Sequence, residues 1–287
     1  MPLGETYADK LADAAGDRWM HVFPNPGKRS GAYMSGFVYD EHPYILLNHQ
    51  DDYNSVSTYA HEWGHALHQV LANETQPQHL AGFSIFTTEA AAIANELLTQ
   101  TYMLSNAKTD QERLYYLGYA LEQIRTTFFR QTMFSEFEGE IYAAMERGEP
   151  LSGDRITQIY GEILRRYHGA DQGVMRIDEL YHNEWLFVPH FYFNFYVFQY
   201  STSIAGAAYF TEQILNGGQE ERDNYLGFLR AGGSKHPYEL FLDAGLDMAS
   251  PEPYEALIRR MDQLLDDFEA TLDRVEAAQA SDSSADS

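Results

Sequence analysis

The run TYAHEWGHALHQ, from Thr58 to Gln69, constrains the fold and chemistry of this chain more than any other stretch. His61 and His65 are four residues apart, so a helix places them one turn apart on one face, where both rings can reach a single metal ion. Glu62 lies beside the first histidine and is placed to take a proton from a water molecule. This HExxH pattern is typical of zinc sites with a glutamate base. An ordinary helix with unrelated histidines is the alternative.

The neighbours of the pattern favour the metal site. Apolar residues flank it at helical spacing, and buried imidazole and carboxylate groups are costly unless they are paired. His68 lies about 10 Å further along the helix axis than His61, too far to share an ion at zinc–nitrogen distances of about 2 Å. It is expected to support another group, line a groove or simply pack. The metzincin arrangement is excluded because His68 and Leu71 stand where its glycine and third histidine would be.

A further ligand must therefore come from another segment, and the stretch FSIFTTEAAAIANELL offers two carboxylates. Glu89 and Glu96 are seven residues apart and share one face of a predicted helix. The residues between them are mostly alanine, which allows a close approach to another helix. One glutamate would bind the metal and the other would orient a ligand histidine. The spacing alone does not decide which is which.

Charge and composition exclude other classes of function. The chain has 43 acidic and 19 basic residues, a net charge of −24, and lacks the basic patch that nucleic acid binding requires. Lysine-poor acidity of this kind also fits a protein from high-salt surroundings. Cysteine is absent, so a metal must be held by His, Asp, Glu or water. No apolar stretch long enough for a membrane span and no signal peptide pattern is visible, so a cytoplasmic protein is expected.

Helical patterns dominate the chain, and a mainly α fold with a small β-sheet before the histidine helix is predicted. The length allows one large domain, or one domain with a small lobe. We assign residues 1–275 to one domain and residues 276–287 to a disordered acidic tail. A short strand is expected at Tyr44–Asn48, in PYILLNH, as the edge strand that offers its backbone to a peptide or as part of a plain ribbon. The predicted helices cover residues 56–72, 88–104, 110–147, 152–167, 219–230 and 251–277, with one more at the start and one after Pro189.

The segment PHFYFNFYVFQYST is rich in tyrosine. Tyr192, Tyr196 and Tyr200 recur every four residues and would form one stripe on a helix. Such stripes are more often core packing than catalysis. Buried hydroxyl groups need partners, however, and tyrosines or the imidazole of His190 beside a metal would stabilise the oxyanion of amide hydrolysis. Tyr192 is the member that could instead only pack.

Four blocks in order resemble the catalytic half of the oligoendopeptidase F family, relatives of thimet oligopeptidase. They are KRSGAYMSGFVYDEHPYILLNHQDD, HEWGHALH, FTTEAAAIANE and WLFVPHFYFNFYVFQYST. The resemblance implies a zincin-like helical metallopeptidase, a zinc-dependent endopeptidase that acts on short peptides. The site residues that it implies are the zinc ligands His61, His65 and Glu89, the general base Glu62, the supporting Glu96, and His190, Tyr196 and Tyr200 as contacts of the substrate and the tetrahedral intermediate.

Two alternatives remain. A zinc carboxypeptidase of the Taq type also carries HExxH on a helical fold. An inactive metal-binding fragment is the other, because members of the family are about twice this length and carry an N-terminal helical region that is expected to be missing here. A site of two histidines and a glutamate also accepts cobalt or manganese. The sequence predicts one zinc ion per chain and does not indicate an oligomeric state.

Overall fold

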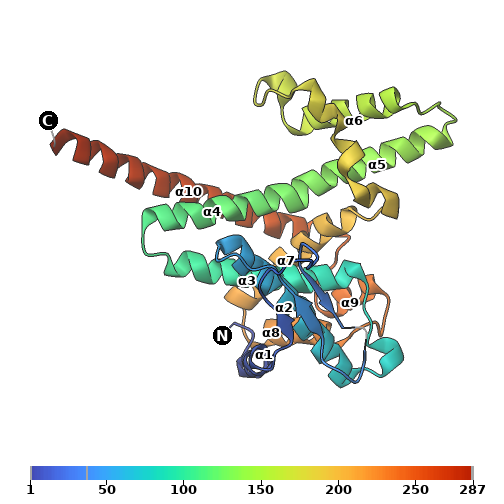
Figure 1. Ribbon diagram of the computed structural model, residues 1–287, viewed down its shortest axis with the longest axis vertical. Coiled ribbons are helices and arrows are strands. Elements are labelled where there is room, and N and C mark those ends of the chain that lie inside the picture. The colour runs from blue at the N-terminus through green and yellow to red at the C-terminus, as the bar shows by residue number, and fades with distance from the viewer. Residues whose placement is uncertain (1, 37, 286–287) are drawn as a thin grey trace. The chain divides into compact units, whose positions relative to one another are not determined.

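The computed structural model describes residues 2–36 and 38–285. Helices dominate these residues, and the predicted mainly helical fold with one small sheet is confirmed (Figure 1). Among the described residues, no helix has both the length and the apolar character needed to cross a bilayer. The α-helices are α1 (Glu5–Gly16), α2 (Tyr53–Thr75), α3 (Ile85–Asn106), α4 (Asp110–Ile124), α5 (Arg130–Glu146), α6 (Gly153–Tyr167), α7 (Phe198–Asn216), α8 (Gln219–Arg230), α9 (Pro237–Asp243) and α10 (Glu252–Ala285).

The chain divides into two compact units. The first combines residues 1–122 with residues 203–287, and the second comprises residues 123–202. The histidine helix and the sheet belong to the first unit, whereas the tyrosine-rich segment belongs to the second. Each unit therefore carries one of the two groups of residues that the sequence singles out.

The sheet has three short strands, β1 (Met20–His21), β2 (Tyr33–Ser35) and β3 (Tyr44–Leu46), in the order β1-β3-β2. Strand β1 runs parallel to β3 and β2 runs antiparallel to it. The expectation that PYILLNH forms the edge strand is wrong, because β3 is hydrogen-bonded on both sides. The edge of the sheet close to the histidine helix belongs to β2, which contacts α2. The edge strand β2 therefore lies in the glycine-rich SGAYMSG stretch, which precedes the PYILLNH strand expected at the edge.

Helix α2 begins at an N-cap, Asp52, whose side chain accepts a hydrogen bond from the Ser55 N–H at 2.7 Å. Helix α6 begins in the same way at Ser152. The long helix predicted over residues 110–147 is present but is interrupted by one π turn at Arg125–Phe129. These two helices thus begin close to where they were predicted to begin, because each has a capping residue at its start.

The C-terminal segment differs from the prediction. Helix α10 continues to Ala285, so residues 276–285 are helical where a disordered tail was expected. The stretch EAAQA at residues 276–280 explains the difference, since alanine, glutamate and glutamine extend an existing helix at little cost. The last two residues of the predicted tail, 286–287, lie outside the described residues.

His68 is part of the core of the first unit. Its side chain is 1% exposed, and its ring stacks on Phe83 with 4.0 Å between centroids and 12° between planes. Of the three roles left open for this residue, packing is the one observed. Burial lowers its pKa from 6.5 to about 3, which means that the folded protein keeps this imidazole neutral.

Replacing His68 by leucine should make the fold less sensitive to acid. Between pH 6.5 and about 3 the unfolded chain takes up a proton that the folded chain does not, so this contribution is complete above pH 6.5 and declines as the pH falls. The stability lost in this way by about pH 5 amounts to ~2 kcal/mol. Urea unfolding at pH 7 and pH 5 should therefore show a larger loss of stability for the wild type than for His68→Leu. Equal losses for the two proteins would contradict the assignment.

Candidate metal centre

Close packing of α2 against α3 builds the site. A Cβ atom added at Gly64 would lie only 2.6 Å from the Cα atom of Ala92, so the glycine allows the two backbones to touch. The Asn95 side chain reinforces the contact by donating to the Ala60 carbonyl at 2.8 Å. The alanines of α3 from Ala90 to Ala94 are buried. The predicted close approach of this helix is confirmed, and it brings the carboxylates of α3 to the histidines of α2.

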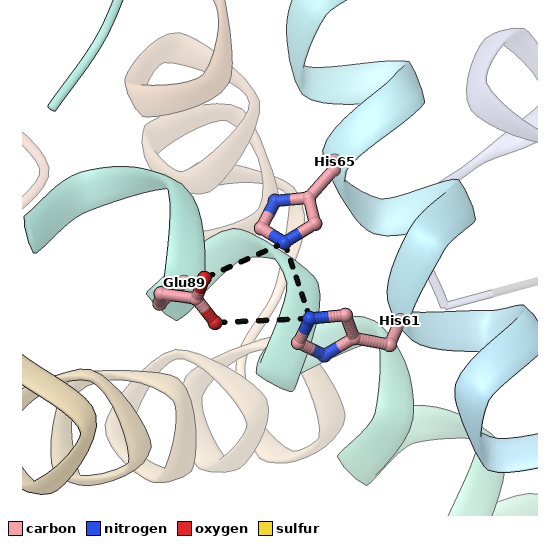
Figure 2. Close-up of side chains that lie close together, drawn as sticks. All are labelled: His61, His65 and Glu89. Atoms are coloured by element: carbon pink, nitrogen blue, oxygen red, sulfur yellow. Dashed lines mark hydrogen bonds and ion pairs between the residues drawn. The ribbon is translucent and has the colours of Figure 1, made fainter. Parts of the chain in front are cut away.

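Three side chains converge at this contact. The Nε2 atoms of His61 and His65 are 3.1 Å apart, and each lies 3.7 Å from one carboxylate oxygen of Glu89 (Figure 2). All three side chains are largely buried. Among the described residues these three form the group of metal-binding type whose donor atoms lie within 4.8 Å of one another. Glu89, rather than Glu96, faces both imidazoles.

The donor set fits a zinc ion. Two ligands of tetrahedral zinc at bond lengths of about 2.0–2.1 Å are about 3.3 Å apart, close to the separations seen here. With both imidazoles neutral, as metal ligands must be, the two Nε2 lone pairs and the Glu89 carboxylate would repel one another at this distance, and a cation between them removes the repulsion. His61, His65 and Glu89 are therefore the residues that would hold the metal.

A second layer of hydrogen bonds fixes the histidine rings. Glu96 accepts from the Nδ1 atom of His61 at 2.7 Å and from the Ser57 hydroxyl at 2.8 Å. The Nδ1 atom of His65 lies 2.8 Å from the Thr88 hydroxyl. Because each Nδ1 atom is engaged in this way, both Nε2 atoms are left free to point into the site. Glu96 is thus hydrogen-bonded to His61, and its supporting role stays a prediction.

Replacing Glu96 by glutamine should weaken zinc binding without preventing it. The amide carries no charge and holds the His61 ring less firmly, and changes of this type cost about 10–100-fold in metal affinity. Competition with a chromophoric chelator measures the dissociation constant directly. The same measurement on Glu74→Gln, at an exposed position of α2, serves as the control and should match the wild type. An unchanged constant for Glu96→Gln would contradict the orienting role.

Glu62 lies beside the three converging residues but is not one of them. Its side chain is 6% exposed, it accepts a hydrogen bond from the Met34 N–H of β2, and its Oε2 atom has no partner within the described part of the chain. Burial, together with the charges of Glu89 and Glu96, raises its pKa to about 7. A buried carboxylate with one oxygen unengaged in this way is placed to exchange a proton with a bound molecule.

The two histidines titrate in opposite directions. Burial disfavours the charged form of His61, but the hydrogen bond to Glu96 and the charges of Glu96, Glu89 and Glu62 outweigh burial and raise its pKa to about 9. The pKa of His65 is lowered well below its usual value by burial and by the charge of His61. Three carboxylates and a histidine pair in one buried space thus form an environment that attracts a cation.

The second unit holds the aromatic residues predicted as substrate contacts. His190 stacks on Tyr196, with 5.6 Å between ring centroids, and meets Tyr200 edge to face at 6.3 Å. The hydroxyl groups of Tyr196 and Tyr200 are 3.4 Å apart. We call these three residues the aromatic cluster. Tyr192 is not part of it, because its side chain is 83% exposed, and the expectation of three buried hydroxyls is wrong at this residue.

The predicted helical stripe does not form either. The segment after Pro189 begins with a 3-10 turn, Pro189–Phe193, and α7 starts only at Phe198. Between them the backbone turns left-handed at Asn194 and Phe195, with φ of 46° and 53°. The cluster is therefore assembled across a turn rather than along a helix.

Sequence reasoning did not find two of the supporting residues, Ser57 and Thr88. Both are small hydroxyl residues of a type common on helix surfaces, and neither belongs to the HExxH pattern. The available signal was position: Thr88 directly precedes Glu89, and Ser57 lies one turn before His61 on the same face.

Comparison with known proteins gives concordant matches. Residues 3–260 match the sequence profile described as Peptidase family M3. Oligopeptidase PepF of Bacillus subtilis is 42% identical over 274 residues, which cover 96% of this chain and 40% of that protein. The crystal structure of a Chlamydophila abortus protein has a TM-score of 0.84 and 37% identity, covering 94% of this chain and 45% of that one. The crystal structure of oligoendopeptidase-F from Enterococcus faecium has a TM-score of 0.67 and 33% identity, covering 77% of this chain and 40% of that one. The chain spans less than half the length of these relatives.

Proposed function

The chain belongs to peptidase family M3, which confirms its resemblance to oligoendopeptidase F, and from this premise we propose that it is a zinc-dependent endopeptidase that cleaves short oligopeptides. The observation that carries the proposal is the convergence of His61, His65 and Glu89 with Glu62 beside them. Family membership supports a peptidase, and the donor set supports zinc as its metal.

His61, His65 and Glu89 would hold the zinc ion, with Glu96 and Thr88 keeping the two imidazoles in place. Bound zinc supplies a Lewis acid that polarises the scissile carbonyl and lowers the pKa of water to about 7. The carboxylate of Glu62 takes the proton from the attacking water and passes it to the amine that leaves. Because Glu62 is buried, bulk water does not reach it, and the proton stays on its carboxyl group until it is transferred to the leaving nitrogen.

The outer edge of β2, the one that does not pair with β3, supports binding of an extended peptide. Its residues Tyr33–Ser35 pair with β3 on one side only, and Met34 contacts the carboxylate of Glu62. A peptide that pairs with a strand edge is recognised through its backbone, so many sequences are accepted. We assign this edge, rather than β3, to the substrate backbone.

The aromatic cluster is assigned to the oxyanion. Tyrosine hydroxyls and an imidazole N–H donate hydrogen bonds, and such donors stabilise the charge that develops on an attacked carbonyl. The support for His190, Tyr196 and Tyr200 is their convergence within the second unit and the resemblance of this segment to the family.

The test is cleavage of an internally quenched peptide by this chain alone, loaded with zinc and then treated with a chelator. We expect cleavage within the peptide, loss of activity with the chelator and recovery on adding zinc. A peptide blocked at its C-terminus separates the alternatives, because a carboxypeptidase of the Taq type would leave it intact. Binding of zinc without any cleavage would instead support an inactive metal-binding fragment.

A further inference from the structure

A buried carboxylate of the second unit has no role in the site described above. Glu138 lies on α5 and is 1% exposed. One of its oxygens, Oε1, accepts a hydrogen bond from the Phe195 N–H at 2.5 Å, and the other, Oε2, has no partner within the described residues. Burying a carboxylate with a single neutral donor is costly. A role of this carboxylate must therefore offset the cost of burying it.

The bonded N–H belongs to the left-handed turn. Asn194 and Phe195 both have positive φ, and a bulky residue such as phenylalanine rarely adopts this conformation without support. The side chain of Phe195 supplies little burial, because it is 44% exposed. Its ring rests on Tyr142, one helical turn after Glu138, at 4.8 Å between centroids. Two side chains on one face of α5 therefore hold this residue, one at its amide and one at its ring.

The same turn assembles the aromatic cluster. His190 precedes it, Tyr196 follows it, and their rings stack. On a continuous helix, residues six apart point about 120° away from each other and could not stack in this way. The left-handed turn is thus what sets the imidazole against the phenol ring.

We propose that Glu138 is a positioning residue: by binding the Phe195 N–H it fixes the turn that places His190 against Tyr196. Its importance for catalysis rests on the proposed peptidase function, in which the aromatic cluster contacts the substrate. Burial raises the pKa of Glu138 and the Phe195 N–H lowers it in part, as expected for a carboxyl group held for its acceptor oxygen.

Two substitutions separate the acceptor from the volume of the side chain. Glu138→Gln keeps a carbonyl oxygen for the Phe195 N–H and should retain kcat within about twofold. Glu138→Met fills a similar space without an acceptor, and kcat should fall roughly 10–100-fold because the cluster is displaced. KM should change little, since the cluster acts on the transition state. Zinc stoichiometry should stay at one in both variants.

A matched control shows whether lost activity reflects lost stability. Ile159→Val trims the hydrophobic core of the second unit, to which Phe137 beside Glu138 belongs, and should lower the midpoint of thermal unfolding while leaving kcat unchanged. Adding Asn194→Gly to Glu138→Met should restore part of kcat, because glycine adopts positive φ at no steric cost. A wild-type kcat in Glu138→Met would overturn the proposal. So would a loss of kcat in Glu138→Gln as large as that in Glu138→Met.

The stability of the turn can also be measured without an activity assay. With ¹⁵N-phenylalanine labelling, the Phe195 amide is the resonance lost in Phe195→Leu. Its hydrogen exchange should be about tenfold faster or more in Glu138→Met than in the wild type. If this holds while the wild type cleaves no peptide, the peptidase function is overturned and the role of Glu138 in the turn is upheld. Equal exchange in the two proteins would overturn that role.

Discussion

Replacing Glu62 by glutamine should reduce peptide cleavage by about 10²–10⁴-fold, the usual contribution of a general base. The amide has the shape of the carboxyl group and should fit the same buried space, but it cannot accept the proton of the attacking water. The residues proposed to hold the metal, His61, His65 and Glu89, are unchanged in this variant. Zinc stoichiometry should therefore remain near one per chain while turnover is lost.

The measurement combines steady-state cleavage of a quenched peptide with metal analysis of the same sample. Glu74→Gln makes the same chemical change at an exposed position of the same helix, and its activity should equal that of the wild type. Turnover by Glu62→Gln at more than a few per cent of the wild-type rate would refute the assignment of the base, whatever its zinc content.

The convergence of His61 and His65 was predictable because the two residues are close in sequence and helical geometry is regular. Four-residue spacing placed His61 and His65 together, and the distance along the axis excluded His68. The choice of Glu89 over Glu96 needed the resemblance to a family, because both carboxylates share one helix face. Which of them faces the two histidines depends on how α2 and α3 pack. That packing cannot be predicted from the sequence of either helix alone.

The aromatic segment was predicted less well, for a physical reason. A four-residue repeat of tyrosine predicts a helical stripe, yet the backbone is left-handed at Asn194 and α7 begins only after this turn. Asparagine is the common non-glycine residue at positive φ, so the sequence held a signal. The decisive contact is a carboxylate more than fifty residues earlier, Glu138, and no local pattern reports such a partner.

Replacing Gly64 by alanine should destabilise the fold by about 2–3 kcal/mol and weaken zinc binding. On helix propensity alone, alanine would stabilise an exposed helical position by about 1 kcal/mol, so the expected sign is reversed. The reason is contact with backbone rather than with a flexible side chain: the new methyl group would lie 2.6 Å from the Cα atom of Ala92. Helix α3 must then move away from α2, and Glu89, one turn before Ala92, moves with it.

Gly227→Ala gives the matched control, because Gly227 lies within α8 and has no atom within 4 Å of its added Cβ. Thermal or urea unfolding should show a gain of up to about 1 kcal/mol for this variant and a loss for Gly64→Ala. Zinc titration of Gly64→Ala should show an affinity at least about tenfold lower than that of the wild type, since the ligand distances depend on the contact. If Gly64→Ala instead gained stability with normal zinc affinity, the close contact of α2 with α3 would not be what sets Glu89 against the two histidines.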